Sequence, residues 1–468
     1  MIAASAQSLT TLLSFDGTDG REPNASLVQG TDVNFYGITF VGGSPTSCPL
    51  TPGIGCGTVF RMTAAGELTT LHSFCSRAKC ADGGQPRGTL VEGANGNFYG
   101  TTQIGGLESQ ECGEGCGTVF EITPSGRLTT LYNFCSQTNC TDGMEPLVGL
   151  AAATNGNFYG TTAYGGANRS GTVFAITPAG SLSVLYSFCA QTSCLDGNFP
   201  SAALVQASNE KLYGSTQFGG TYNRGTIFEI TTAGALTTLH IFNKGINPAP
   251  NTMIQGPDGI LYGTTNVGGA ARDGTVFRMT VAGKLTYMHS FCLSACTDGF
   301  RPAGLAQGSD GNFYGTTSGG GATSYGGTVF EITPTGTFTT LYNFCAQTGC
   351  PDGDGPGGLV QATNGNFYGI TGAGGADNYG TAFSLSTGLG PFVAARPGFG
   401  PAGRVIAILG NNLTGTTSVT FNGTAAAFTV ASGTLIKATV PAGATTGTIE
   451  VTTPSGTLSS NVAFQIVP

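Results

Sequence analysis

The chain has 468 residues and a net charge of −8; 78 of its residues are Gly, and only 9% are charged. Average proteins contain ~7% Gly and ~25% charged residues. Dense Gly disfavours long helices, and aromatic residues at 9% disfavour a disordered chain. The acidic balance provides no basic footprint for nucleic acid, and no apolar run reaches the ~18 residues of a membrane span. The composition favours a β-rich, turn-rich globular protein.

The first residues resemble the end of a signal peptide. The segment Ala3-Ala4-Ser5-Ala6-Gln7 carries the small-x-small pattern of a signal-peptidase site, without a basic or long apolar region before it. We therefore predict that residues 1–8 are a signal-peptide remnant or a disordered start, and that the protein is secreted.

Three phrases then repeat along the chain, each of them seven times. An aromatic-Tyr-Gly phrase, a Gly-Thr-x-Phe phrase and a Leu-Thr-Thr-Leu-like phrase ending in Phe follow one another at intervals of roughly 50–60 residues. The Tyr residues are Tyr36, Tyr99, Tyr159, Tyr213, Tyr262, Tyr314 and Tyr368. The Gly residues are Gly57, Gly117, Gly171, Gly225, Gly274, Gly327 and Gly380, and the terminal Phe residues are Phe15, Phe74, Phe134, Phe188, Phe242, Phe291 and Phe344.

Each phrase alternates large apolar residues with small or polar ones, which is the period of a β-strand. With the apolar run before each Tyr, a unit has four short antiparallel strands, as in a propeller blade. We predict a seven-bladed β-propeller over residues 9–388. The third phrase appears first in the chain and is missing from the last unit, so residues 9–15 are expected to complete the seventh blade and close the ring. Exchange of this strand with a neighbouring molecule is the alternative.

The repeat resembles a known family. Units such as Gly156-Asn-Phe-Tyr-Gly-Thr-Thr162 followed by Gly171-Thr-Val-Phe174 resemble the Gloeo-Verruco (GloVer) tandem repeat of bacterial extracellular proteins. This resemblance covers residues 9–388 and implies a secreted or surface-displayed protein. It implies no established chemistry.

A second module follows the repeats. Residues 389–403 are rich in Pro and Gly and are predicted to be a linker. Residues 404–468 contain short alternating strands typical of a small β-sandwich, with Phe421, Phe428 and Phe464 as core residues. The motifs also resemble an IPT/TIG immunoglobulin-like domain, which we interpret as a structural spacer.

The 14 Cys fall into seven short-range pairs. Three His are too few to complete a zinc site at each pair, so we predict local disulfides and an oxidising compartment. The pairs are Cys48–Cys56, Cys75–Cys80, Cys112–Cys116, Cys135–Cys140, Cys189–Cys194, Cys292–Cys296 and Cys345–Cys350.

Long connections should gather on one face of a propeller, together with all the Cys, and we expect the ligand to bind there. Glu22 and Glu145 with Arg87 between them could place two carboxylates beside a cation at the channel mouth, as glycoside hydrolysis requires. A solvated rim without catalysis is the alternative. Further candidates for ligand binding are Asn247, Arg301, Tyr164, Phe218, Tyr222, Tyr325 and Tyr379. The three His lie on the outermost strands, so no Ser/His/Asp set can be assembled.

No cofactor is predicted. Asp16-Gly-Thr-Asp-Gly20 and Asp352-Gly-Asp354 could contact calcium but do not match a full calcium loop. Three functions remain: a non-enzymatic protein that binds glycan or protein, a polysaccharide hydrolase or lyase with an acidic site, and a purely structural surface or matrix protein. We expect a monomer without a nucleic-acid partner.

Overall fold

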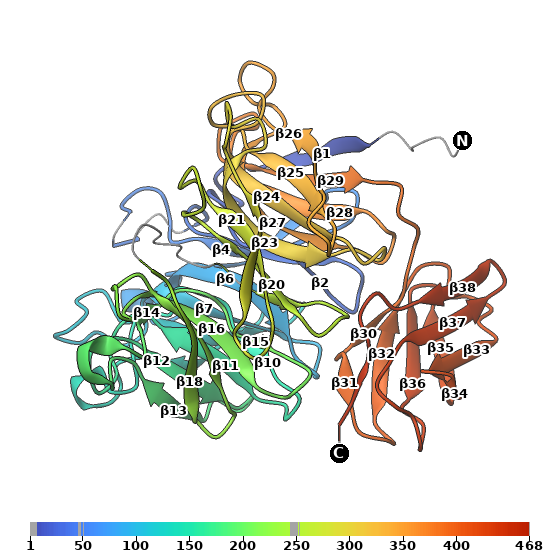
Figure 1. The fold of residues 1–468 in the computed structure, drawn as a ribbon, viewed down its shortest axis with the longest axis horizontal. Coiled ribbons are helices and arrows are strands. Elements are labelled where there is room, and N and C mark those ends of the chain that lie inside the picture. The colour runs from blue at the N-terminus through green and yellow to red at the C-terminus, as the bar shows by residue number, and fades with distance from the viewer. Residues whose placement is uncertain (1–6, 45–47, 50, 244–250, 252, 468) are drawn as a thin grey trace.

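The computed structural model describes residues 7–44, 48–49, 51–243, 251 and 253–467. Its only helices within these ranges are three short 3₁₀ turns, η1 (Ala78–Cys80), η2 (Thr138–Cys140) and η3 (Thr192–Cys194). The described strands of residues 8–386 form seven antiparallel sheets (Figure 1). The prediction of an all-β protein built from four-stranded sheets is confirmed for six of these sheets, and the remaining sheet has five strands because two short strands, residues 198–200 and 205–206, pair with the same neighbour.

The sheets, numbered here in chain order, are built as follows. Sheet 1 contains β2 (Val28–Gln29), β3 (Phe35–Thr39), β4 (Thr58–Met62) and β5 (Leu68–Ser73), and sheet 2 contains β6 (Gly84–Glu92), β7 (Phe98–Ile104), β8 (Thr118–Ile122) and β9 (Leu128–Asn133). Sheet 3 contains β10 (Ala151–Ala152), β11 (Phe158–Thr162), β12 (Thr172–Ile176) and β13 (Leu182–Ser187). Sheet 4 contains β14 (Asn198–Pro200), β15 (Val205–Gln206), β16 (Leu212–Phe218), β17 (Thr226–Ile230) and β18 (Leu236–Ile241). Sheet 5 contains β19 (Ile254–Gln255), β20 (Leu261–Thr265), β21 (Thr275–Met279) and β22 (Leu285–Ser290). Sheet 6 contains β23 (Phe300–Gln307), β24 (Phe313–Gly319), β25 (Thr328–Ile332) and β26 (Phe338–Asn343). Sheet 7 contains β27 (Asp354–Gln361), β28 (Phe367–Ala373), β29 (Thr381–Ser386) and, from the start of the chain, β1 (Ser8–Ser14).

The first strand of the chain completes the last sheet. β1 pairs antiparallel with β29, from Ser8 opposite Ser386 to Ser14 opposite Thr381. Sheets 1 and 7 also contact each other, because the ring of Phe35 stacks on Tyr368 at 4.2 Å between centroids. The expected pairing of the N-terminal strand with the last unit is therefore present within one chain.

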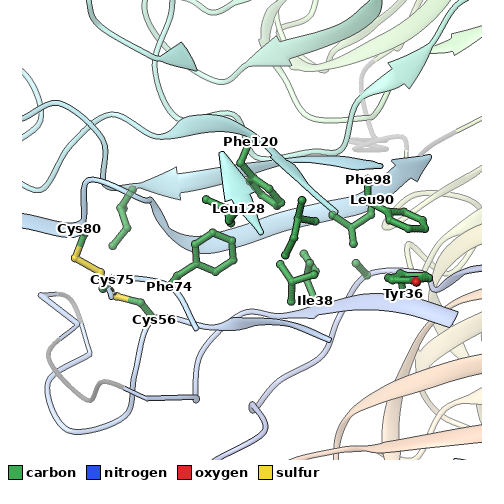
Figure 2. Close-up of a cluster of buried hydrophobic side chains, with 14 of the residues drawn as sticks. Tyr36, Ile38, Cys56, Phe74, Cys75, Cys80, Leu90, Phe98, Phe120 and Leu128 are labelled. Atoms are coloured by element: carbon green, nitrogen blue, oxygen red, sulfur yellow. Dashed lines mark hydrogen bonds between the residues drawn. A yellow bond between two sulfur atoms is a disulfide. The ribbon is translucent and has the colours of Figure 1, made fainter. Parts of the chain in front are cut away.

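The repeated aromatic residues fill the spaces between sheets. Tyr36 stacks on Phe98 of the next sheet with ring centroids 3.8 Å apart, and Phe74 meets Phe120 edge-on at 5.3 Å (Figure 2). The Gly after each Tyr is explained by this packing, since a Cβ on Gly100 would lie 2.6 Å from Cζ of Phe120. The repeated phrases thus encode contacts within and between sheets.

Buried Thr pairs join the second and third strands. Thr102 and Thr118 bond through their hydroxyls at 2.9 Å, and both side chains are fully buried. The other sheets hold the same pair, as Thr39–Thr58, Thr162–Thr172, Thr216–Thr226, Thr265–Thr275, Thr317–Thr328 and Thr371–Thr381. Each hydroxyl satisfies its partner inside the sheet, where an unpaired one would be costly.

Two classes of long loop lie together on one side of the sheets. One class joins the last strand of a sheet to the next sheet, and the other joins the second and third strands. Gly106 N–H, in the second class, donates to the carbonyl of Cys80, in the first, at 2.9 Å, and Gly166 N–H does the same to Cys140. We call this side the loop face and the opposite side, which carries the short turns, the turn face.

Residues 394–466 form a separate two-sheet module, drawn in orange and red in Figure 1. One sheet contains β30 (Ala394–Arg396), β32 (Val405–Leu409), β36 (Leu435–Thr439) and β35 (Phe428–Ser432). The other contains β34 (Thr424–Ala425), β33 (Ser418–Phe421), β37 (Ile449–Thr453) and β38 (Gly456–Ser459), and β31 (Phe399–Gly400) pairs with β39 (Gln465–Ile466). Phe421 and Phe464 meet in its core at 5.1 Å, as predicted, and Phe428 is partly buried against the same core.

The predicted linker needs a correction. Within residues 389–403, β30 and β31 are strands of the module, and Phe392 and Val393 are buried. β30 and β31 are only two or three residues long, and the Pro and Gly residues around them are typical of a linker. The sequence therefore did not predict these strands.

Candidate functional site

The first strands of the sheets surround a central cavity of about 470 Å³. Residues of all seven repeat units line it, including Asn24, Thr89, Val148, Ser201, Asn251, Gly304 and Gly358. None of the described residues that line it is charged. The cavity is therefore a neutral channel whose wall combines small polar side chains with aliphatic ones such as Leu90 and Leu204.

An unusual turn sets the mouth of this channel on the loop face. Wherever the structure describes it, the residue before the Pro that begins a unit has a left-handed backbone, with φ of 53° at Glu22, 52° at Gln85 and 54° at Glu145. Glu145 N–H donates to the carbonyl of Cys116 in the preceding unit at 2.8 Å. This bond between units maintains a conformation that non-Gly residues rarely adopt, so the side chains at the mouth have fixed directions.

Arg87 lies at this mouth between three sheets. Its Nε donates to Oε1 of Gln103 at 3.0 Å, and its guanidinium carbon lies 4.0 Å from the centre of the Phe40 ring. Gln103 Nε2 in turn donates to Oε2 of Glu145 at 3.3 Å. Phe40, Arg87 with Gln103, and Glu145 belong to sheets 1, 2 and 3, so their meeting depends on the packing of the sheets. We call this group, with Glu22, the mouth cluster.

The mouth cluster combines one cation with two carboxylates. Burial lowers the pKa of Arg87, and the charges of Glu22 and Glu145 oppose this effect. The structure thus brings the three predicted residues together. Glu22 is exposed and Glu145 is half-buried, so both carboxylates can be reached from solvent. The cluster presents donors and acceptors together and carries a formal charge of −1.

Aromatic rings adjoin the mouth cluster on sheets 3 and 4. Tyr164 meets Phe199 edge-on at 5.1 Å, and Phe199 meets Phe218 at 6.0 Å. The backbone of Tyr164 pairs with Met144, the residue directly before Glu145. Tyr164 is 40% exposed, so this aromatic cluster offers apolar surface beside the polar groups.

The other candidates are more dispersed. Tyr379 packs under the guanidinium of Arg21 at 3.9 Å, which assigns it to packing between sheets 7 and 1. Arg301 is exposed beside Phe300, and Tyr222 and Tyr325 are 45% and 74% exposed on loops of the loop face. Asn247 lies outside the described residues.

Sequence reasoning missed Gln103 and Phe40. Both residues follow the Thr that ends the repeated phrase of the second strand, a position that reads Phe40, Gln103, Ala163, Gln217, Asn266, Ser318 and Gly372. The residue type at this position varies between units, and this variation could have identified Gln103 and Phe40. Glu22, Arg87 and Glu145 were predicted from the same kind of variation.

All seven predicted disulfides join their Cys pairs in the structure, and no Cys is free. Every pair lies in a loop of the loop face. Two groups of three Cys sulfurs lie within 4.8 Å of one another, but each of these sulfurs is in a disulfide. The bonds hold the loops that surround the mouth.

Several Asp residues of the loop face accept hydrogen bonds within their own turns. Asp82 accepts from the backbone of Ser76 at 3.1 Å and from Nε2 of His72 at 2.9 Å. His289 pairs with Asp298 in the same way. Of the calcium candidates, Asp352 accepts from Tyr342 and from the backbone of Cys345. In the Asp16 loop, Oδ1 of Asp16 accepts from Thr18. These oxygens are used as turn caps, and calcium binding stays an untested expectation.

Comparison with known proteins gives a family. The model of the Gloeobacter/Verrucomicrobia repeat matches residues 1–140, 109–305 and 249–461. The chain belongs to this repeat family. No curated protein sequence matches it significantly. The disulfides and the repeat family are typical of extracellular proteins, and no helix among the described residues is long and apolar enough to cross a membrane.

Several solved structures are similar to this chain in fold. Virginiamycin B lyase from Staphylococcus aureus, an inactive variant solved with quinupristin, is 15% identical with a TM-score of 0.53 over 81% of this chain and 99% of its own. A streptogramin B lyase is 14% identical with the same TM-score over 82% and 99%. The extracellular domain of a putative hybrid two-component system from B. thetaiotaomicron is 12% identical, with a TM-score of 0.50 over 99% of this chain and 60% of its own. These similarities support a propeller-like fold for the repeat family.

Proposed function

We propose that this member of the repeat family is a secreted seven-bladed propeller, residues 9–388, that binds a glycan at the channel mouth. Residues from 389 onward form a spacer module, for which an IPT/TIG immunoglobulin-like fold is our expectation. The observation that carries the proposal is the mouth cluster, which places Arg87, Gln103 and Glu145 in one bonded chain on an otherwise neutral channel.

The chemistry of the mouth suits a polyhydroxylated ligand. Guanidinium, carboxamide and carboxylate groups each form paired hydrogen bonds with neighbouring hydroxyls. The aromatic cluster beside them can cover the apolar face of a sugar ring. A protein ligand would need a contact of roughly 800 Å² per partner, whereas the mouth is a compact feature next to a cavity of about 470 Å³. We therefore favour glycan over protein.

A polysaccharide hydrolase or lyase is the second candidate, because two carboxylates lie near Arg87. Neither carboxylate is in an apolar pocket of the kind that holds a catalytic carboxylic acid protonated. The solved virginiamycin B lyase was inactivated by a His-to-Ala change. The three His of this chain lie on outer strands β5, β18 and β22, away from the mouth. Binding without cleavage is the better supported function.

The test is a glycan array of neutral and acidic polysaccharides, followed by titration calorimetry on the best ligand. We expect Arg87→Ala to weaken binding at least tenfold, or ~1.4 kcal/mol, because the guanidinium orders both Gln103 and Glu145. Arg127→Gln, in a short turn of the turn face, is the matched control and should bind like the wild type.

The same samples are examined for new reducing ends and unsaturated sugars. Cleavage that disappears in Glu145→Gln would show that the protein is an enzyme. Binding that Arg87→Ala leaves unchanged would place the site elsewhere, and no binding to any glycan would support the purely structural function.

A further inference from the structure

A Gln side chain ties neighbouring sheets together on the turn face. Oε1 of Gln206 accepts from the backbone N–H of Thr154 in the preceding sheet at 2.8 Å, and its Nε2 donates to a carbonyl of its own turn at 3.0 Å. Gln255 and Gln361 make the same two bonds. A carboxamide suits this position because it accepts on one side and donates on the other.

Glu92 stands at this position in sheet 2. The seven residues are Gln29, Glu92, Ala152, Gln206, Gln255, Gln307 and Gln361, so Glu92 alone is charged. Its Oε1 accepts from Thr31 N–H at 3.1 Å, as a Gln would. Its Oε2 cannot donate, is buried, and has no hydrogen-bond partner. Within the sheets Glu92 is therefore worse than Gln, because a buried carboxylate oxygen without a donor is costly.

The partner of this oxygen comes from the C-terminal module. Nε of Arg396, in β30, lies 4.0 Å from Oε2 of Glu92. An opposite charge at this distance offsets part of the cost of burying the carboxylate. The one charged residue at this position thus lies where the module presents a cation.

Other bonds attach the module to the far side of the ring. Phe392 N–H donates to the carbonyl of Thr363 at 3.1 Å, Asn411 Nδ2 donates to the Thr363 hydroxyl at 3.1 Å, and Gln307 donates to the carbonyl of Asn461 at 3.3 Å. These contacts reach sheets 6 and 7, whereas Arg396 reaches sheet 2. The module therefore bridges across the axis of the ring, and Figure 1 shows β30 and β31 on its side nearest the sheets.

The module also meets the end of the channel. A cavity of about 310 Å³ lies between them, lined by Gln29, Leu305 and Gln361 from the sheets and by Phe392 and Arg396 from the module. Leu305 lines the central cavity as well. The module thus lies over the turn-face end of the channel.

We infer that the C-terminal module closes the turn-face end of the channel, and that the Glu92–Arg396 ion pair fixes its rotational position on the ring. The sheets repeat nearly the same turn surface seven times, so a module without this ion pair could dock in several rotations. The charged residue makes one of these positions distinct. A ligand then reaches the channel from the loop face alone.

The decisive variants are Glu92→Gln and Arg396→Gln in the full chain. Glu92→Gln introduces the residue that most other sheets have at this position, so the sheets should remain intact. The module should lose its ion pair with the ring. We expect hydrogen exchange at the amides of residues 392–393 and 459–461 to rise at least fivefold in both variants. Exchange in β7 and β8 should stay unchanged. Glu229→Gln, which removes the 2.6 Å ion pair with Lys211 inside sheet 4, is the control and should leave the module amides unaffected.

Two outcomes would overturn the inference. Exchange at residues 392–393 within twofold of the wild type in both variants would mean that the pair does not position the module. Independent tumbling of the module in the wild type, seen as a separate rotational correlation time in ¹⁵N relaxation, would mean that it does not close the channel. A fivefold rise of hydrogen exchange at residues 392–393 in the double variant, no greater than in either single variant, would support a direct interaction between Glu92 and Arg396.

Discussion

Buried aspartates show how one repeated residue behaves differently according to its neighbours. Burial raises the pKa of Asp82, but hydrogen bonds from His72, Ser76 and the backbone outweigh this effect and hold the pKa below its ordinary value. Tyr132, Tyr186 and Tyr342 bond the equivalent Asp in their own sheets. The His or Tyr that bonds each Asp comes from the preceding strand, and this pairing is visible only in the structure.

Asp19 lacks such a partner because Leu13 stands where the other strands carry His or Tyr. Burial, together with the charge of Asp16, raises the pKa of Asp19 to about 6. Its ionised form therefore destabilises the fold, and the stability is full below the ordinary pKa and falls as the pH rises through 6. We expect Asp19→Asn to be more stable than the wild type at pH 8, by on the order of 1 kcal/mol once solvent screening is allowed for.

Urea unfolding at pH 4 and pH 8 measures this effect, and the gain should vanish at pH 4. Asp82→Asn is the contrasting variant and should lose stability at pH 8, because its carboxylate is favoured by its donors. Equal responses of both variants at pH 8 would contradict the assignment.

At the scale of elements, ring closure depends on β1. This strand pairs with β29 over six positions, and Leu12 and Leu13 pack against the core between sheets 7 and 1. Without β1, β29 would present an unpaired edge, which promotes association between chains.

Deletion of residues 7–14 should therefore lower the melting temperature and produce aggregation on heating, measured by circular dichroism and light scattering. A synthetic peptide of residues 7–15 added in trans should restore the transition. A peptide with both Leu12 and Leu13 replaced by Asp is the control and should not. Unchanged melting of the deletion variant would show that β1 does not seal the ring.

At the scale of the whole molecule, disulfides divide the chain into two parts. All 14 Cys lie between Cys48 and Cys350, and residues 389–468 contain none. The module has its own core, formed by residues such as Ile406, Val419 and Ile436.

Reduction should thus destabilise the repeats and spare the module. In the loop-entropy model each small ring is worth ~2 kcal/mol, so we expect dithiothreitol to shift the calorimetric transition of the repeats to lower temperature. The module serves as an internal control, and its transition should move by less than 2 °C or so. Equal shifts in both transitions would show that the two parts unfold as one unit.

The sequence by itself determined the repeat, the strands and the Cys pairs, because each depends on residues that are close in the chain. It also indicated Glu22, Arg87 and Glu145, since these charged residues break the repeated pattern at the two positions that flank the repeated Pro. Only the tertiary structure joined Arg87 to Gln103 and Phe40, and Glu92 to Arg396. These partners belong to different sheets or to the module, and no local pattern records which side chains meet when separate units pack together.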